Sequence, residues 1–251
     1  MLLIAWKNMR AEKARFAFSV AGVAVAALLL AFMLALYTGW KERIASYVRD
    51  VPANIWVVQD GNESFFSASL VPEERLEEVR GMPGVTGVNS LLGRGLKVGF
   101  EGKSSDSYVL GFDAGGIGGP IHIKKGSGTP GPGEIVIDDV LARTSGFGMG
   151  DELTVSDRTL KVVGISTGGN IVLNQLSFVS KEEARALVGL DGFSNFGLVR
   201  TEPGRSAEVI DRINRDVEGV TAFSSKEFAS KSRKVLQRSV LPILGVVLVL
   251  V

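Results

Sequence analysis

Two uncharged, apolar runs frame a longer polar segment in this chain of 251 residues. The first run, residues 16–38, has the sequence FAFSVAGVAVAALLLAFMLALYT. A membrane-spanning helix needs about 20 apolar residues, so this run predicts one transmembrane helix. The second run, residues 239–251, would extend over only about 19 Å as a helix, which is too short to cross a bilayer. It predicts the start of a second, incomplete transmembrane helix, and hence the front part of a longer protein.

Basic residues gather before the first run. Residues 1–15 hold only one acid, Glu12, whereas the charges after the run nearly balance. The basic residues of this flank are Lys7, Arg10, Lys13 and Arg15. The positive-inside rule therefore predicts a cytoplasmic N-terminus and an extracytoplasmic middle segment. A cleaved signal peptide is the alternative, but its apolar region would be shorter and would end in a small-residue cleavage site.

The same flank also fits a short amphipathic helix on the cytoplasmic surface of the membrane. Apolar residues, Trp6 among them, alternate with the basic ones, which would face lipid headgroups. Trp6, Arg10, Lys13 and Arg15 are therefore candidate contacts with the lipid bilayer. A basic flank that only sets the topology explains the pattern equally well.

The middle segment, residues 50–225, mixes charged, glycine and β-branched residues, as a folded domain outside the membrane would. Strands are predicted at 54–59 and 196–200, and helices at 72–80 and 205–217. After each helix a Gly-Val-Thr motif, at Gly84 and again at Gly219, leads into another strand. A strand–helix–strand unit that occurs twice predicts a ferredoxin-like arrangement.

Between the two units lies a glycine-rich and strand-rich insertion. Its clearest part is 133–165, where short apolar strands alternate with turns such as Gly150-Asp151. The expected fold class is therefore α+β. A ferredoxin-like part (50–100 and 196–225) carries a small β-rich insertion (101–195), and a transmembrane helix precedes them.

A further helix, the stalk at 226–238, is predicted to lead into the second apolar run. Phe228 belongs to its apolar stripe, and Lys231, Lys234 and Arg238 belong to its basic face. Phe65 and Phe66 are adjacent aromatics in a polar loop. All six are candidate contacts with a partner or the membrane. The alternatives are a solvated helix face for the stalk and packing beneath the loop for the two phenylalanines.

Composition and short motifs limit the kinds of site that the chain can hold. The chain has no cysteine, which excludes disulfides and thiolate metal sites, and its net charge of +1 gives no support for binding nucleic acid. The run Gly115–Gly119 is followed by Pro120 and lacks the Lys-Ser/Thr of a phosphate loop, so it predicts a flexible loop. The lone His122 fits a structural strand position. The sequence therefore predicts no catalytic, cofactor-binding or metal-ligating residue.

The segment GEIVIDDVLARTSGFGMGDELTVSDRTLKVVGI (133–165) resembles the core of the periplasmic domain in MacB/FtsX-type ABC-transporter permeases. The N-terminal AWKNMRAEKARFAFSVAGVAVA resembles the family's approach to its first span, and Pro-Gly-Val-x-x-Val at 83–88 also fits. The resemblance covers nearly the whole chain. It implies one span, a large outer domain and then three more spans in the plasma (inner) membrane. This chain would hold the first span, the outer domain and only the beginning of the second span.

The resemblance implies a non-catalytic permease subunit of the MacB/LolC/FtsX type. Such a subunit binds no cofactor itself, because a separate cytoplasmic ATPase uses the ATP and Mg²⁺. It pairs with a second copy or a paralogue, and a periplasmic adaptor protein is a further partner. Its task would be export or extraction of a substrate from the outer side. The alternatives are an FtsX-like signalling protein that activates a cell-wall hydrolase and, if Val251 is the true end, a singly anchored binding domain.

Overall fold

The computed structural model describes residues 13–44, 46–169, 175–235 and 238. The chain divides into two compact units. One unit is Glu42–Val235, here called the sheet domain, and the other includes residues 13–41. The predictions for Trp6, Arg10 and the apolar run 239–251 lie outside the described residues.

Helix α2, Lys13–Ile44, contains the first apolar run. Its segment Lys13–Ala35 has a mean hydropathy of 2.5 and none of its most apolar window is buried inside the protein. By length and composition this helix can cross a bilayer, as predicted for 16–38, although a signal sequence would meet the same criteria. Exposed side chains such as Phe18 and Leu28 leave an apolar surface that water would not favour.

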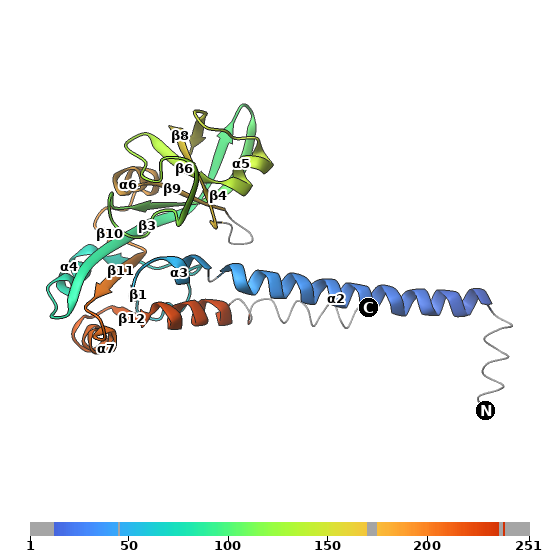
Figure 1. Cartoon of the computed structure of the whole chain (residues 1–251), viewed down its shortest axis with the longest axis horizontal. Coiled ribbons are helices and arrows are strands. Elements are labelled where there is room, and N and C mark those ends of the chain that lie inside the picture. Colours follow the sequence, from blue (N-terminus) through green and yellow to red (C-terminus); the bar gives the residue numbers. More distant parts are fainter. Residues whose placement is uncertain (1–12, 45, 170–174, 236–237, 239–251) are drawn as a thin grey trace. The chain divides into compact units, whose positions relative to one another are not determined.

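The first half of the sheet domain has the ferredoxin-like order. Four antiparallel strands lie in the order β12-β1-β11-β3 (Figure 1), which is 4-1-3-2 when these strands are counted along the chain. The strands are β1 (Ile55–Gln59), β3 (Val85–Phe100), β11 (Phe196–Thr201) and β12 (Val220–Ser224). The connecting helices are α4 (Glu73–Arg80) and α7 (Ser206–Asp216). The doubled strand–helix–strand pattern is therefore confirmed.

Strand β1 shows why this sheet has a core on each side. Ile55 and Val57 face α4 and α7, whereas Trp56 and Val58 belong to a separate core cluster on the other face. Successive residues of a strand point to opposite faces, so a strand buried on both sides is continuously apolar. The sequence IWVV meets that requirement, and all four side chains are 0% exposed.

The predicted insertion is rich in strands, but it continues the same sheet. Beyond β3 the order is β4-β9-β6-β8-β5, and β7 pairs with both β3 and β8. The strands are β4 (Lys103–Phe112), β5 (His122–Gly126), β6 (Glu134–Asp138), β7 (Glu152–Val155), β8 (Arg158–Thr167) and β9 (Gln175–Ser180). Helices α5 (Asp139–Ser145) and α6 (Lys181–Val188) pack on this half.

Strand β3 joins the two halves. Its first residues pair with β11 from Val85 to Leu91, and its later ones pair with β4 from Leu91 to Phe100 (Figure 1). A separate two-stranded ladder links β2 (Val71–Pro72) with β10 (Phe193–Ser194). The sheet therefore has no break at residue 101, where the sequence predicted the insertion to begin.

Candidate functional site

The chain enters and leaves the sheet domain through one group of aromatic side chains, here called the aromatic cluster. Its members come from α3 (Ser46–Asp50), β1, the loop before β2, β11 and the helical residues 225–235, here called the exit helix. They are Tyr47, Trp56, Phe65, Phe196 and Phe228, each at most 1% exposed. Trp56 is central, with its ring centroid 5.4 Å from that of Phe228 and 6.4 Å from that of Tyr47.

Helix α3 follows directly on the long apolar helix and is held by its buried face. Tyr47 and Val48 are both buried, and the Tyr47 hydroxyl donates a hydrogen bond to the carbonyl oxygen of Gly118. Burial, with a smaller contribution from Tyr108, raises the pKa of the Tyr47 hydroxyl far above its ordinary value of 10. The hydroxyl therefore stays protonated and keeps donating to the glycine-rich loop.

The glycine-rich loop is packed and takes part in this core, which corrects the predicted flexible loop. Ile117 is only 4% exposed. A Cβ atom placed on Gly118 would lie 2.5 Å from a methyl carbon of Leu91, so the loop approaches β3 more closely than a side chain permits. After the loop the chain enters β5 at His122.

The exit helix is fixed at its first turn and again two turns later. The Ser225 amide donates to the Asn54 carbonyl at 3.1 Å, and its hydroxyl donates to the Ala53 carbonyl at 2.5 Å. Further along, the Phe65 amide donates to the Ser232 hydroxyl oxygen at 3.1 Å. The residues just before β1 therefore hold the start of the exit helix.

Two of the predicted contact residues are part of this core, so their prediction as surface contacts is wrong. Phe65 is 1% exposed and Phe228 is 0% exposed, because both rings pack against Trp56. Phe66 is 42% exposed and remains available to a partner. The packing alternative therefore holds for one member of the pair, and the exposed alternative holds for the other.

The predicted basic residues differ in their surroundings. Lys231 forms an ion pair with Glu63 at 2.5 Å, and its amino group lies 5.0 Å from the centre of the Phe223 ring. Lys231 therefore helps to hold the exit helix, beyond being one charge on a solvated face. The other described basic candidates, Lys13, Arg15, Lys234 and Arg238, are exposed, and their contacts with a membrane or partner remain predictions.

An ion-pair network links α4 of the first half to α6 of the second half. Glu73 accepts from Lys181 at 2.9 Å, from Arg185 at 2.7 Å and from the Ser194 hydroxyl at 3.0 Å. Desolvation raises the pKa of Glu73, but these three partners outweigh it and hold the pKa below its ordinary value. Sequence reasoning missed this network because its members lie more than 100 positions apart along the chain.

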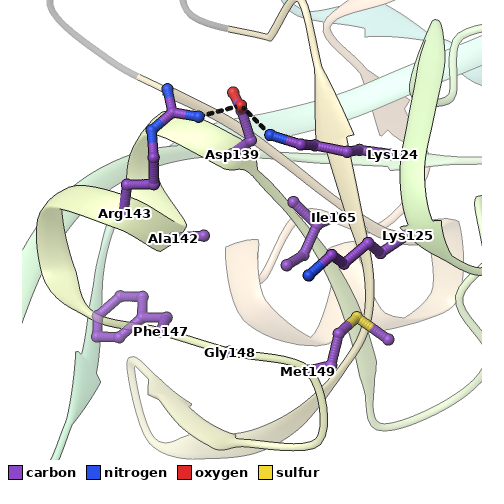
Figure 2. Close-up of a pocket in the computed structure, with 9 residues that line it drawn as sticks. All are labelled: Lys124, Lys125, Asp139, Ala142, Arg143, Phe147, Gly148, Met149 and Ile165. Carbon is purple, nitrogen blue, oxygen red and sulfur yellow. Dashed lines mark hydrogen bonds and ion pairs between the residues drawn. The ribbon is translucent and has the colours of Figure 1, made fainter.

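A pocket of about 320 Å³ lies between α5, β5 and the loop after α5 (Figure 2). Apolar side chains line its inner part and basic ones lie at its rim. The lining residues are Lys124, Lys125, Asp139, Ala142, Arg143, Phe147, Gly148, Met149 and Ile165. Sequence analysis singled out none of them as a site, because α5 and β5 lie close together only through the pairing of β8 with both β5 and β6. The described ranges contain no group of three acidic, histidine or cysteine side chains placed to hold a metal ion.

Comparison with known proteins identifies the family and the fold of this chain. The sequence model of the MacB-like periplasmic core domain family matches residues 16–216. Two solved structures share the fold. The periplasmic region of MacB from Actinobacillus actinomycetemcomitans has a TM-score of 0.54 and 10% identity, over 71% of this chain and 92% of that one. The extracellular domain of the noncanonic ABC-type transporter YknZ from Gram-positive bacteria has a TM-score of 0.51 and 14% identity, over 68% and 100%. No curated protein matches the chain.

Proposed function

The chain belongs to the family of MacB-like periplasmic core domains, and on that premise we propose that it is a permease subunit of an ABC transporter. A separate cytoplasmic ATPase hydrolyses ATP with Mg²⁺, and this chain converts the resulting movement of membrane helices into movement of the sheet domain. The subunit is not itself an enzyme. It acts on a substrate at the outer side of the membrane, by export or extraction.

The observation that carries this proposal is the shared anchoring of the incoming and outgoing chain. Helix α3 follows the candidate membrane helix directly, and its Tyr47 packs against Trp56. Phe228 of the exit helix stacks on the same Trp56 ring. Protein cores are densely packed and resist deformation, so displacement of either helix would be passed to β1 at the middle of the first half.

The proposed topology follows the charge pattern of the sequence. Lys13 and Arg15 stand at the start of α2 and favour a cytoplasmic N-terminus, which puts the sheet domain outside. The subunit would pair with a second copy or a paralogue in the plasma (inner) membrane. A periplasmic adaptor protein would be a further partner on the outer side.

The first test is isolation of the native protein from its own membranes with whatever it binds. An ABC ATPase should co-purify and hydrolyse ATP in the complex. A different result would instead support the FtsX-like signalling alternative. In that case a cell-wall hydrolase would be recovered bound to the sheet domain, and deletion of the gene for this protein would not affect transport. Failure to recover any ATPase would refute the permease function.

The second test concerns coupling. Because the chain lacks cysteine, a single cysteine at the exposed Asp157 can carry a spin label in each of two paired subunits. ATP should change the label-to-label distance in the purified complex. Phe228→Leu should reduce that change while ATP hydrolysis continues, and Phe193→Leu, at a position 39% exposed, should not. An unchanged distance in the presence of ATP would contradict the coupling role.

A further inference from the structure

The pocket beside α5 combines an apolar interior with a basic rim. Ala142, Phe147, Met149 and Ile165 contribute the apolar surface. Three basic side chains and one acid, Asp139, complete the lining, so its formal charge is positive. Figure 2 shows Asp139 together with Lys124 and Arg143 at one end of the pocket, and Phe147 and Met149 at the other end.

The basic side chains are not equivalent. Lys124 donates to Asp139 at 3.1 Å, and Arg143 donates to the same carboxylate oxygen from the next turn of α5. Desolvation raises the pKa of Asp139, but these two cations outweigh it and lower the pKa, so the carboxylate stays charged. Lys125 makes no ion pair among the described residues, and its amino end is directed between Ile165 and Met149 toward α5 (Figure 2). It is the cation left available to a ligand.

The apolar side of the pocket is kept open by the backbone. Met149 remains 43% exposed although it lies over the end of β5. A Cβ atom on Gly126 would lie 2.6 Å from the terminal methyl of Met149 and 2.2 Å from the Val163 carbonyl oxygen. Glycine therefore gives the methionine room at this edge. Methionine is a flexible, polarizable side chain that suits an adaptable apolar contact.

We propose that this pocket binds a small single-chain amphiphilic anion, such as a medium-chain fatty-acid carboxylate. The carboxylate would accept from the Lys125 amino group, and the apolar chain would lie along Met149, Phe147 and Ile165. A volume of about 320 Å³ is at the lower end of the usual range for ligand pockets, which suits one short chain and excludes a two-chain lipid. This binding does not depend on the proposed transport function.

Charge and surface together select this ligand class. A small inorganic anion would meet Lys125 but leave the apolar wall in contact with water, which gains nothing. A cationic amphiphile would fill the apolar wall but face three basic groups without compensation. Only a ligand with both an apolar chain and a negative head satisfies the two sides at once.

The experiment uses the protein in nanodiscs of zwitterionic phosphatidylcholine and a decanoic acid that carries a photoreactive diazirine near its methyl end. Mass spectrometry then locates the cross-link. We expect labelling of the segment that contains Phe147 and Met149, and competition by decanoate. Decyltrimethylammonium, with the same chain and a cationic head, and acetate, with the head alone, should compete at least tenfold less well.

Three variants complete the test. Lys125→Gln should reduce labelling about tenfold through loss of a charge-assisted hydrogen bond. Met149→Glu should abolish labelling, because it places a negative charge where the apolar chain of the anionic ligand would lie. Lys161→Gln, an exposed lysine on β8, should leave labelling unchanged. The proposal is overturned if labelling of this segment is absent, if the cationic amphiphile competes equally well, or if Lys125→Gln labels as strongly as Lys161→Gln. Trp56 fluorescence shows whether each variant is folded.

Discussion

Phe65 and Phe66 offer a comparison in which chemistry and sequence position are nearly identical and burial is not. Phe65 is 1% exposed and Phe66 is 42% exposed. The perturbation is the same in both cases, replacement by alanine. The structure predicts that Phe65→Ala strongly destabilises the sheet domain, whereas Phe66→Ala has a small effect.

The magnitudes follow from the contacts. The Phe65 ring lies 5.0 Å from the ring of Phe196 and 5.9 Å from that of Trp56, so its removal leaves a cavity in the aromatic cluster. A buried Phe→Ala replacement costs about 3–5 kcal/mol in the free energy of unfolding. Phe66 buries little more than half of its side chain, so its replacement should cost about 1 kcal/mol.

Trp56 supplies the assay, because it is fully buried and contacts Phe65 directly. Replacement of the other two tryptophans, Trp6 and Trp40, by phenylalanine makes fluorescence report on the aromatic cluster alone. Unfolding in urea has a slope of about 2 kcal/mol per M for a domain of this kind. The midpoint should therefore fall by about 2 M for Phe65→Ala and by about 0.5 M for Phe66→Ala. Equal shifts in the two variants would refute the placement of this loop.

Two further predictions test other parts of the sheet domain. Because its partners lower the pKa of Glu73, its ionised form contributes stability above its ordinary pKa of 4.5, and this contribution is lost as the pH falls through the lower folded-state value. Unfolding by urea should therefore show Glu73→Gln less stable than the natural protein at pH 7 and a smaller difference at pH 3, with Glu74→Gln as the exposed control; a difference that grows in acid would contradict the network. Gly93→Ala should lower the Tm by about 4–8 °C, because its Cβ would lie 2.3 Å from the Val109 carbonyl oxygen. Gly95→Ala is the control, because a Cβ atom there meets nothing within 4 Å, and its Tm should change by less than about 2 °C. An equal fall in Tm of the two variants, measured by calorimetry, would contradict the close approach at Gly93.

The elements that sequence analysis predicted were those with local patterns. The continuous apolar run of β1 and the helical spacing of α7 are each contained in a few turns or residues, so period and capping residues suffice to find them. Their repeated order then predicted the first half of the sheet.

The parts that were missed depend on contacts between distant residues. Strand β4 pairs in parallel with β9, so that Ser107 lies opposite Gln175. No local period reports such a partner, and this pairing joins β9, and through it β6, to the part of the sheet formed by β3 and β4. The same limit applies to Phe65, whose amide is bonded to Ser232, 167 positions away. Phe65 and Phe66 look alike in the sequence because the contacts that distinguish them, with Ser232, Trp56 and Phe196, come from other parts of the chain.

The candidate pocket could not be predicted for a related reason. Lys124 and Lys125 resemble ordinary solvated charges on an edge strand, where lysine is common. Phe147 and Met149 follow a helix in a glycine-rich turn and resemble loop residues. Their combination becomes a site only because the pairing of β5 with β8 brings the two segments together.

Strand β3 has a consequence that depends on its length. It runs for 16 residues, which at about 3.3 Å per residue corresponds to about 50 Å. The strand begins beside α4, and its far end, Phe100, packs against Phe147 at the pocket. A tilt of β3 by about 10° about its first residue would move its last residue by roughly 9 Å, close to the width of a helix. If the strand turned as one rigid unit, such a tilt would displace Phe100 far enough to open or close a contact with a neighbouring molecule.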